Sequence, residues 1–245
     1  MTVSNNVNNN DINKRYLWRL GLMSYDSAFK IQNCIARKHL DSMVKGVNAD
    51  FDTILLVEHK PVYTVGIRDE TPKDEIERLR SLGAEFKQTN RGGLITFHGP
   101  GQLVAYPVIN LKHYKTSVKW YVNSLEQTII NLCEELGLKA SRSPHTGVWV
   151  EDNKIAAIGI HASRYVTTHG ISLNCDNDLT WFDHITPCGI EDKGVTSLTK
   201  ETGVVCSTEK IIPMFLKNFE NVFSCSSEDM EVDLQEDILN KLQEN

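Results

Sequence analysis

The sequence lacks the features typical of disulfide-rich secreted proteins, membrane-spanning proteins and nucleic-acid binders. Its six cysteines form no C-x-x-C pair, which argues against a disulfide framework or a cysteine-rich zinc site and favours a reducing compartment. No apolar run approaches the roughly 18–20 residues that span a bilayer. The 26 Lys and Arg against 32 Asp and Glu give a formal net charge of −6, whereas a general nucleic-acid binder needs surplus positive charge. We therefore expect a soluble intracellular protein without a metal site, a membrane span or a nucleic-acid partner.

The composition that remains is ordinary for a folded chain of 245 residues, with 40% hydrophobic and 24% charged residues. Residues 1–14 are rich in asparagine and predict a disordered tail. Residues 226–245 are acidic and polar, and predict a tail that forms at most a short exposed helix and contributes nothing to a core. No repeat or linker interrupts the chain between these ends, so we expect one domain over residues 15–225.

Strand-like and helix-like periods alternate within this domain. Two-residue or continuous apolar patterns predict strands over 16–20, 53–58, 147–150, 154–162 and 166–174. Helical spacing predicts helices that start at Ser24 and Ser117, one over 71–83 and one over 208–223. The strand–turn–strand spacing around 151–153 indicates antiparallel hairpins. The fold class that follows is α+β, with a mostly antiparallel or mixed sheet and flanking helices.

A glycine-rich segment at 91–101 (RGGLITFHGPG) is the first candidate binding element. Glycines allow positive φ angles and let a ligand approach the main chain closely. Arg91 is suited to bind an anion and His98 to move a proton. The alternative is two tight turns on either side of a short strand. The segment is neither G-x-G-x-x-G nor a P-loop, so it predicts no nucleotide.

Two later strands carry polar residues with two interpretations each. Lys154 opens an apolar strand, and is either an edge residue with its ammonium in water or a lysine beside an apolar pocket that acts on protons. Alternation places His169, Ile171 and Leu173 on one strand face, where His169 is more often structural than catalytic. Gly170 leaves space beside the sheet for another chain or a ligand.

Cys188 differs from the other five cysteines because Pro187 and Gly189 place it on a turn. The other five lie in expected helices, strands or tails, where cysteine behaves as a small hydrophobic residue. A thiol is reactive only as the thiolate, and a neighbouring ammonium such as that of Lys154 favours the thiolate. Spacing alone does not show that the two are neighbours, so a thiol nucleophile is one interpretation among several.

Together these segments resemble the lipoyl(octanoyl) transferases, and most closely their mitochondrial branch. The resemblance covers residues 16–205, and its most specific parts are the RGG…HGPGQ and PCG motifs. The matching stretches are RGGLITFHGPGQLVAYPV at 91–108, GVWV-EDN-KIAAIG at 147–159, THGISLN at 168–174, the PCGI segment at 182–190 and GVTSL at 194–198.

The resemblance implies the catalytic-domain fold of biotin and lipoate protein ligases, and transfer of an octanoyl group from acyl carrier protein to a lysine of a lipoyl domain. Cys188 would form the acyl-thioester, and Lys154 would lower the pKa of Cys188 and accept a proton. At Ser172 many relatives have alanine, a change that a pocket wall should tolerate. The substrate pocket would be lined by Arg91, Gly92, Gly93, Leu94, Ile95, Thr96, Phe97, His98, Ala157, Ile158, Gly159, Gly170, Ile171 and Ser172.

The donor is already an activated thioester, so the resemblance implies no cofactor, neither ATP nor a metal. Backbone N–H groups of the glycine-rich segments are natural donors to an oxyanion, and Gly159 and Gly170 are positions where strands leave room for an acyl chain. Lys112, Lys115 and Lys119 form either a docking cluster for an acidic carrier or a solvated helix start.

The implied acceptors are lipoyl domains of 2-oxoacid dehydrogenases and the glycine cleavage H protein. The implied location is the mitochondrion, with the cytoplasm as the alternative because residues 1–13 show no clear transit peptide. Two other functions stay open: an ATP-dependent lipoate or biotin ligase of the same fold, and a non-catalytic carrier-binding scaffold.

Overall fold

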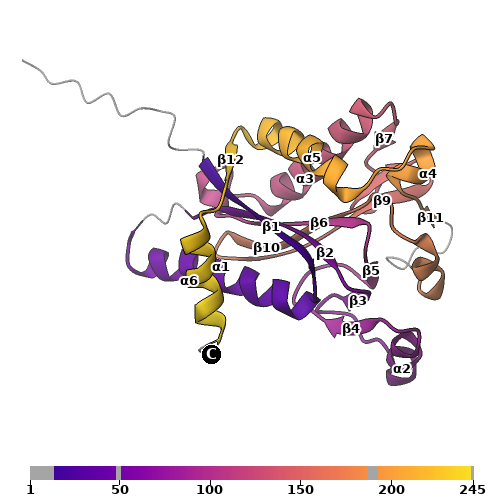
Figure 1. Cartoon of the computed structure of the whole chain (residues 1–245), viewed down its shortest axis with the longest axis horizontal. Coiled ribbons are helices and arrows are strands. Elements are labelled where there is room, and N and C mark those ends of the chain that lie inside the picture. The colour runs from indigo at the N-terminus through magenta and orange to yellow at the C-terminus, as the bar shows by residue number, and fades with distance from the viewer. Residues whose placement is uncertain (1–13, 48–50, 187–192, 244–245) are drawn as a thin grey trace, which may run out of the picture.

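One large β-sheet crosses the molecule, and helices cover both of its faces (Figure 1). The computed structural model describes residues 14–47, 51–186 and 193–243. The order across the sheet is β12 (Ser226–Asp229), β1 (Lys14–Met23), β2 (Thr53–His59), β6 (Gln102–Val108), β10 (Val166–Asn174), β9 (Asn153–Ser163), β8 (Val148–Val150) and β7 (Ala140–Ser141), with β11 (Gly194–Val195) also paired to β9. β12, β1 and β2 are parallel, as are β11 and β9, and the other pairs are antiparallel. The expected mixed sheet is confirmed.

The alternation of β2 explains why both faces need cover. Ile54 and Leu56 pack into the hydrophobic cluster beneath α3 (Val118–Glu135) and α5 (Thr208–Phe223), whereas Leu55 and Val57 pack into the cluster beneath α1 (Tyr25–Val44). Side chains of a strand alternate between faces, so an apolar run such as TILLV is stable only when both faces are buried. α4 (Leu198–Thr202) precedes α5 in the chain, and η1 (Leu111–His113) precedes α3.

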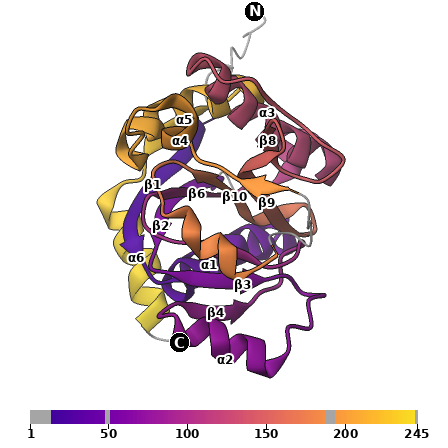
Figure 2. The same ribbon diagram turned by 90° about the vertical axis from the view of Figure 1, so that its right-hand side faces the viewer.

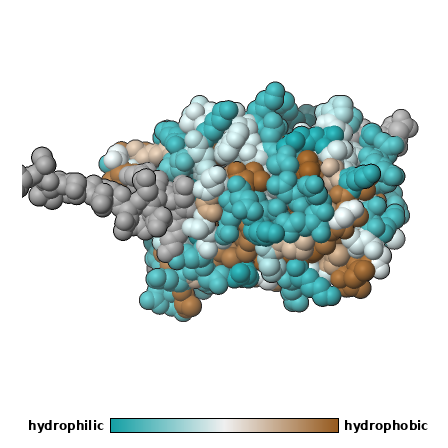
Figure 3. All heavy atoms as spheres, turned by 90° about the horizontal axis from the view of Figure 1, so that it is seen from above, coloured by the Kyte–Doolittle hydropathy of each residue, from teal (hydrophilic) through white to brown (hydrophobic). Residues whose placement is uncertain are grey.

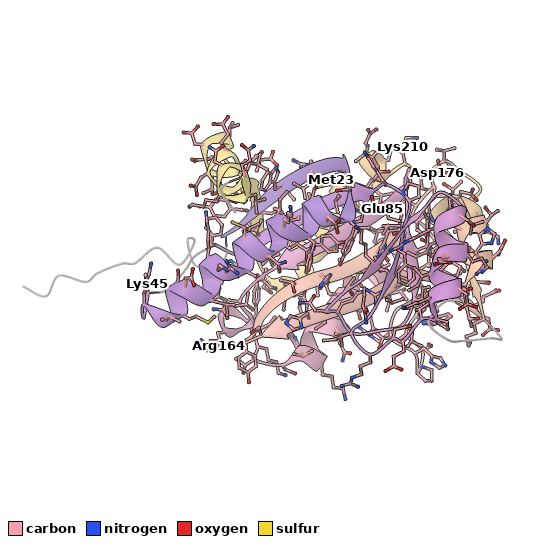
Figure 4. All side chains as sticks on the ribbon, turned by 90° about the horizontal axis from the view of Figure 1, so that it is seen from below. Met23, Lys45, Glu85, Arg164, Asp176 and Lys210 are labelled. Carbon is pink, nitrogen blue, oxygen red and sulfur yellow. The ribbon has the colours of Figure 1, made fainter. Side chains whose placement is uncertain are left out.

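The expected helices and the hairpin are confirmed. Ser24 and Ser117 are the N-caps of α1 and α3, and each side chain accepts a backbone N–H three residues later. The helix predicted over 208–223 is α5, and β8 and β9 join through the predicted turn. α1 crosses the lower face of the sheet, with Met23 beside one end and Lys45 at the other (Figure 4).

A small second sheet lies on the α1 side of the large one (Figure 2). Its order is β4 (Glu85–Gln88), β3 (Val62–Val65) and β5 (Thr96–His98), and α2 (Lys73–Ser81) connects β3 to β4. The 3-10 helix η2 (Leu179–His184) packs on this sheet, because the Trp181 ring stacks on Phe97 at 4.9 Å and Tyr63 Oη donates to the Trp181 carbonyl at 2.8 Å. The small sheet therefore positions both the 91–98 segment, which includes β5, and η2, which precedes Cys188 in the chain.

The expectation for the C-terminal segment is wrong over its described part. β12 extends the large sheet, and α6 (Val232–Gln243) packs beside α1. Met230 and Ile238 are buried in the same cluster as Leu55 and Val57. Leu234 and Leu242, each four residues from Ile238, pack against the same cluster. This apolar stripe holds an otherwise acidic helix against the core, so composition underestimated the segment. Lys14, which we placed in the N-terminal tail, begins β1, and residues 1–13 lie outside the described residues.

The face of the molecule seen from above carries interspersed hydrophilic and hydrophobic residues (Figure 3). Over the described ranges, no helix is both long enough and apolar enough to cross a membrane. Lys112, Lys115 and Lys119 are exposed around η1 and the start of α3. These lysines follow the C-terminal end of β6. That end lies about 20 Å along the strand from Gln102, the first residue of β6. Their role in docking stays a prediction.

Candidate active site

Two neighbouring cavities lie where the small sheet meets β9 and β10. We name the first the arginine cavity, and it is narrow. The volume in which the centre of a water molecule fits is about 40 Å³. Its lining includes the buried side chains of Arg91, His98 and His169 together with apolar residues. Its full lining is Tyr25, Arg91, Gly93, Leu94, Thr96, His98, Val104, Tyr106, Ala157, Ile158, Gly159, His169, Gly170, Ile171 and Ser172.

The second, which we name the lysine cavity, is smaller, about 10 Å³ by the same measure. Its lining is Thr96, Gln102, Lys154, Ala157, Ser172, Asn174, Phe182 and Val195. Thr96, Ala157 and Ser172 line both cavities. The two therefore adjoin, and together they make a slot that runs from Lys154 to Arg91.

The 91–98 segment contributes alternate residues to the slot. Leu94, Thr96 and His98 line the arginine cavity, whereas Ile95 and Phe97 pack into the hydrophobic cluster with Trp181 and Phe182. This alternation is that of the short strand β5. The expectation that every residue from Arg91 to His98 lines the pocket is thus corrected for Ile95 and Phe97. It is also corrected for Gly92, whose N–H donates to the Ile160 carbonyl at 3.0 Å.

Lys154 is buried, with 6% of its surface exposed. Its Nζ lies 4.8 Å from the centroid of the Trp149 ring, a cation–π contact. The register of β8 on β9 shifts between Val148 and Trp149, and such a bulge re-aims side chains. It explains how Lys154 and Ala157, three residues apart, line one cavity. Gly147 lets the chain lie close to β9, because a Cβ there would lie 2.6 Å from Ala156 O and 3.3 Å from Lys154 Cε.

The guanidinium of Arg91 is held by main-chain carbonyl groups. Its NH2 group donates to Thr64 O at 2.7 Å and Leu94 O at 3.1 Å, and NH1 donates to Gly92 O at 2.9 Å. It also donates to Thr64 Oγ1 at 2.9 Å. These bonds hold the glycine-rich loop against β3. The interpretation of Arg91 as an anion-binding residue is therefore weaker than its interpretation as a brace.

His98 is neutral and its tautomer is fixed by its neighbours. Gln102 Nε2 donates to Phe97 O at 3.1 Å and to Asn174 Oδ1 at 2.9 Å, so Gln102 Oε1 accepts from His98 Nδ1 at 2.7 Å. His98 Nε2 then accepts from the Thr64 hydroxyl at 3.3 Å. Burial lowers the pKa of His98 to about 3, with a further contribution from His59. Near neutral pH this imidazole carries no charge.

His169 does not share a face with Ile171 and Leu173, which corrects the expected alternation. Its φ is +57°, a left-handed conformation that costs free energy in a non-glycine residue. Its ring stacks with Phe29 at 5.4 Å on the α1 side, whereas Ile171 and Leu173 pack on the α3 side. The Gln32 side chain accepts the His169 backbone N–H at 2.7 Å and holds this conformation. Burial lowers the pKa of His169 to about 3.

The glycines of the paired strands make room for protein rather than for a ligand. A Cβ on Gly159 would lie 2.8 Å from Arg91 Cδ and 2.8 Å from Gly92 O. A Cβ on Gly170 would lie 2.2 Å from Ala105 O and 2.9 Å from Pro107 Cδ. Both glycines line the arginine cavity. Their small size lets the loop and a neighbouring strand approach closely enough to form its wall.

Cys188 lies outside the described residues, so the position of its sulfur stays a prediction. The described chain stops at Thr186 and resumes at Lys193, and both residues border one hollow together with Phe182 and Val195. Phe182 and Val195 also line the lysine cavity, and Val195 is the strand partner of Lys154. Thr186, two positions before Cys188 in the sequence, thus borders the hollow next to the lysine cavity.

Three of the other cysteines are poor nucleophiles. Burial raises the pKa of Cys133 to about 12 and that of Cys225 to about 11, and it raises the pKa of Cys175 further still. A buried thiol far above its usual pKa stays protonated near neutral pH and is inert. Within the described ranges, no group of three His, Cys, Asp or Glu side chains is arranged to hold a metal ion.

Sequence reasoning missed Tyr25, Val104 and Tyr106 as residues of the arginine cavity, and left His169 unsettled between substrate contact and structure. The polar residues Gln102 and Tyr106 in the otherwise apolar strand β6 were the available signal. Tyr25 begins α1, and nothing in its local pattern separates it from a core aromatic residue. Only the packing of α1 against β10 brings it to the cavity.

Comparisons with known proteins agree with this fold and identify the family. The sequence matches the lipoyl protein ligase A/B catalytic domain family over residues 24–220. It is 55% identical over 208 residues to the mitochondrial octanoyl-[acyl-carrier-protein]:protein N-octanoyltransferase LIPT2 of Danio rerio, covering 84% of this chain and 91% of that protein. It is 44% identical to the Homo sapiens protein of the same name, covering 86% of this chain and 94% of that protein.

Solved structures show the same fold at low sequence identity. A lipoate-protein ligase A bound with ATP superposes with a TM-score of 0.72 at 12% identity, covering 94% of each chain. A structure from an archaeal lipoylation system, the bi-partite lipoate protein ligase and its E2 lipoyl domain of Thermoplasma acidophilum, superposes with a TM-score of 0.67 at 13% identity. It covers 94% of this chain and 91% of that chain.

The fold and the slot define the catalytic domain shared by lipoyl ligases and transferases. Within that class, the chain belongs to the lipoyl(octanoyl) transferase family.

Proposed function

We propose that this chain transfers an octanoyl group from octanoyl-acyl carrier protein to a lysine of a lipoyl domain, with a Cys188 thioester as the intermediate. The observation that carries the proposal is the slot between Lys154 and Arg91, which is narrow and mostly apolar and begins at a buried lysine. The similarity to octanoyltransferases over 84% of the chain supports the same reaction. We also propose that residues 15–225 form one domain, as the sequence predicts, with one change: β12 and α6 belong to the same domain.

In the first step the Cys188 thiolate attacks the carbonyl carbon of the octanoyl thioester. A carbon–sulfur bond forms, and the carbonyl electron pair moves to oxygen. When the carbonyl re-forms, the carbon–sulfur bond to the carrier breaks and the carrier thiolate leaves. The Lys154 ammonium favours the Cys188 thiolate before attack and gives its proton to the leaving thiolate. The exchange of one thioester for another has little thermodynamic cost.

In the second step the acceptor lysine, as a neutral amine, attacks the Cys188 thioester. The amine loses a proton to the neutral Lys154, an amide bond forms, and the Cys188 thiolate leaves. The acceptor ammonium gives its first proton to solvent before the attack, and the second proton returns Lys154 to its ammonium form for the next cycle. Amide formation from a thioester is downhill, which is why the reaction needs no ATP.

The slot supports an acyl chain as its occupant. Leu94, Val104 and Ala157 give the farther cavity apolar walls. We propose that the predicted residues that line the slot contact the substrate, and that Gly92, Ile95 and Phe97 support the slot without touching the substrate.

The proposed acceptors are lipoyl domains of 2-oxoacid dehydrogenases and the glycine cleavage H protein, and the proposed compartment is the mitochondrion. The names of the Danio rerio and Homo sapiens relatives support both the acyl-carrier donor and this location.

The decisive experiment mixes the protein with octanoyl-acyl carrier protein in the absence of ATP and measures the intact mass. We expect one octanoyl adduct on the wild type and on Cys133→Ala, and none on Cys188→Ala. An adduct that persists on Cys188→Ala would refute the assignment of the nucleophile.

A second arm separates the transferase from a ligase of the same fold. Free octanoate with ATP should give no product on an apo lipoyl domain, whereas octanoyl-acyl carrier protein alone should give octanoyl-lysine. The reverse result would identify an ATP-dependent ligase, and no product in either arm would favour a non-catalytic scaffold.

A further inference from the structure

Two hydroxyl groups stand at the junction of the two cavities. Thr96 on β5 and Ser172 on β10 are both buried, with 7% and 5% of their surfaces exposed, and both line both cavities. Among the residues that the structure describes, neither hydroxyl oxygen has a hydrogen-bond partner. Neither oxygen is enclosed by protein, in contrast to Thr168 Oγ1, which is enclosed and unpaired. A buried hydroxyl that opens into a cavity is available to a ligand there.

The other polar side chains of the arginine cavity direct their donors into the protein. Arg91 donates to three carbonyl groups, and His98 Nδ1 to Gln102. His169 Nε2 donates to Asn90 Oδ1 at 2.7 Å, and the Tyr106 hydroxyl to His59 Nε2 at 2.8 Å. The Tyr25 hydroxyl lies 3.5 Å from His169 Nδ1. These groups form the wall of the cavity, but their N–H and O–H groups are directed to acceptors within the protein.

Two backbone N–H groups of the glycine-rich segments also donate to acceptors within the protein. The Gly92 N–H donates to Ile160 O at 3.0 Å, and the Gly101 N–H donates to Glu58 Oε2 at 2.6 Å. The expectation that N–H groups of these segments bind an oxyanion is therefore wrong for these two glycines. Thr96 and Ser172 are hydroxyl donors that the slot offers where its two cavities meet.

We propose that the Thr96 hydroxyl, assisted by Ser172, donates the hydrogen bond that stabilises the oxyanion during octanoyl transfer. This inference rests on the function proposed above. The acyl tail lies toward Arg91 and the reacting sulfur toward Lys154, so the carbonyl between them falls at the junction that Thr96, Ala157 and Ser172 form.

The hydroxyls act on charge that exists only during the reaction. When sulfur attacks the carbonyl carbon, the π electron pair moves to oxygen, and a donated hydrogen bond stabilises that oxyanion until the carbonyl re-forms. Neither hydroxyl gives up its proton. The same two donors serve the attack of the acceptor amine, because it passes through an oxyanion at the same carbon. Thr96 has the larger role, since the resemblance expects alanine to be tolerated at Ser172.

The test measures the rate of acyl-enzyme formation in a single turnover with octanoyl-acyl carrier protein. Thr96→Val keeps the size of the side chain and removes the donor, so we expect a rate about 10–100-fold lower at saturating donor, with half-saturation unchanged. Thr96→Ser should restore most of the rate, and Ser172→Ala should slow acylation by only a few-fold. Thr168→Val is the matched control, because its hydroxyl lies on β10 but outside both cavities.

Alkylation of Cys188 by iodoacetamide provides a second readout, since it forms no oxyanion. We expect Thr96→Val to leave the alkylation rate unchanged. Equal slowing of alkylation and acylation, or full acylation activity in Thr96→Val, would overturn the proposal. If the wild type itself forms no Cys188 adduct, the proposed function fails instead, and the two failures are thereby distinguished.

Discussion

The two ends of the slot both contain a buried cation, yet they use it differently. At one end Arg91 has its guanidinium bound to the carbonyls of Thr64, Gly92 and Leu94. At the other end Lys154 lies beside the Trp149 ring and lines a cavity that adjoins the hydroxyls of Thr96 and Ser172. The first cation holds a loop in place, and the second lies where chemistry is possible.

The difference follows from the geometry of the two side chains. A planar guanidinium has five donors and binds several carbonyls at once, whereas an ammonium is a compact charge that gains and loses a proton. The histidines agree with this division. His98 and His169, beside Arg91, are neutral because of burial, so they add no charge to the apolar end of the slot.

The largest effect is expected from Lys154→Met, which keeps the side-chain stem and removes the charge. Octanoyl transfer should fall by about 10²–10⁴-fold, because the proton donor and acceptor is lost. The pH midpoint of Cys188 alkylation should rise toward the free value of about 8.5. An unchanged alkylation profile would remove Lys154 from its role at the thiol, even if transfer were slow.

Arg91→Met should act mainly on stability. It leaves buried carbonyls of the loop and of β3 without a donor, so the free energy of unfolding should fall by about 3 kcal/mol or more. Urea denaturation measures this, with Arg68→Met as an exposed control that should change by less than about 0.5 kcal/mol. Full stability with abolished transfer would contradict the comparison, because it would make Arg91 a substrate-binding residue.

Gly159→Ala should have a smaller effect of the same kind. Its Cβ would press on Arg91 Cδ and Gly92 O, so we expect a loss of about 1–3 kcal/mol in unfolding free energy. Gly92→Ala is the matched control, since the nearest atom to its Cβ would be Ile160 O at 3.7 Å. Equal stability of the two variants would show that Arg91 and its loop shift freely.

A separate effect on stability is expected from mild acid. Burial lowers the pKa of His59 to about 4 and that of His98 to about 3, whereas an unfolded histidine titrates near 6.5. Below about pH 6.5 the unfolded chain therefore binds protons that the folded chain does not, and stability falls as pH falls toward 4. Thermal unfolding between pH 7 and pH 4 measures this decline.

His59→Gln should flatten that decline, because it removes one of the groups that titrate only in the unfolded chain. The exposed His145→Gln should leave the slope unchanged. Identical slopes for all three proteins would show that His59 does not contribute to acid sensitivity.

Local pattern was sufficient to predict α1, α3 and α5, because a cap and an apolar stripe are both written in consecutive residues. It failed for the end of the chain, where Met230 and Ile238 are too few to signal a buried segment. It failed also at His169, whose left-handed backbone depends on Gln32 of a distant helix. Alternation assumes a regular strand, and a contact from another element can break that regularity.

The candidate site was predictable in its residue types more than in their roles. The RGG…HGPGQ, KIAAIG and THGISLN motifs gave most of the lining of the slot. They did not reveal that Ile95 and Phe97 turn away from it, that Arg91 is bound to carbonyls, or that two glycines accommodate neighbouring protein atoms. Each of these depends on a partner that is remote in sequence.

The sequence by itself determined α1, α3, α5 and several strands of the large sheet, together with the family and the residues that can react, because caps, periods and motifs are local properties of the chain. Tertiary structure alone decided which donors stay available in the slot. Availability depends on whether another part of the chain has already taken the hydrogen bond, and that is settled only when β3, β5, β9 and β10 come together.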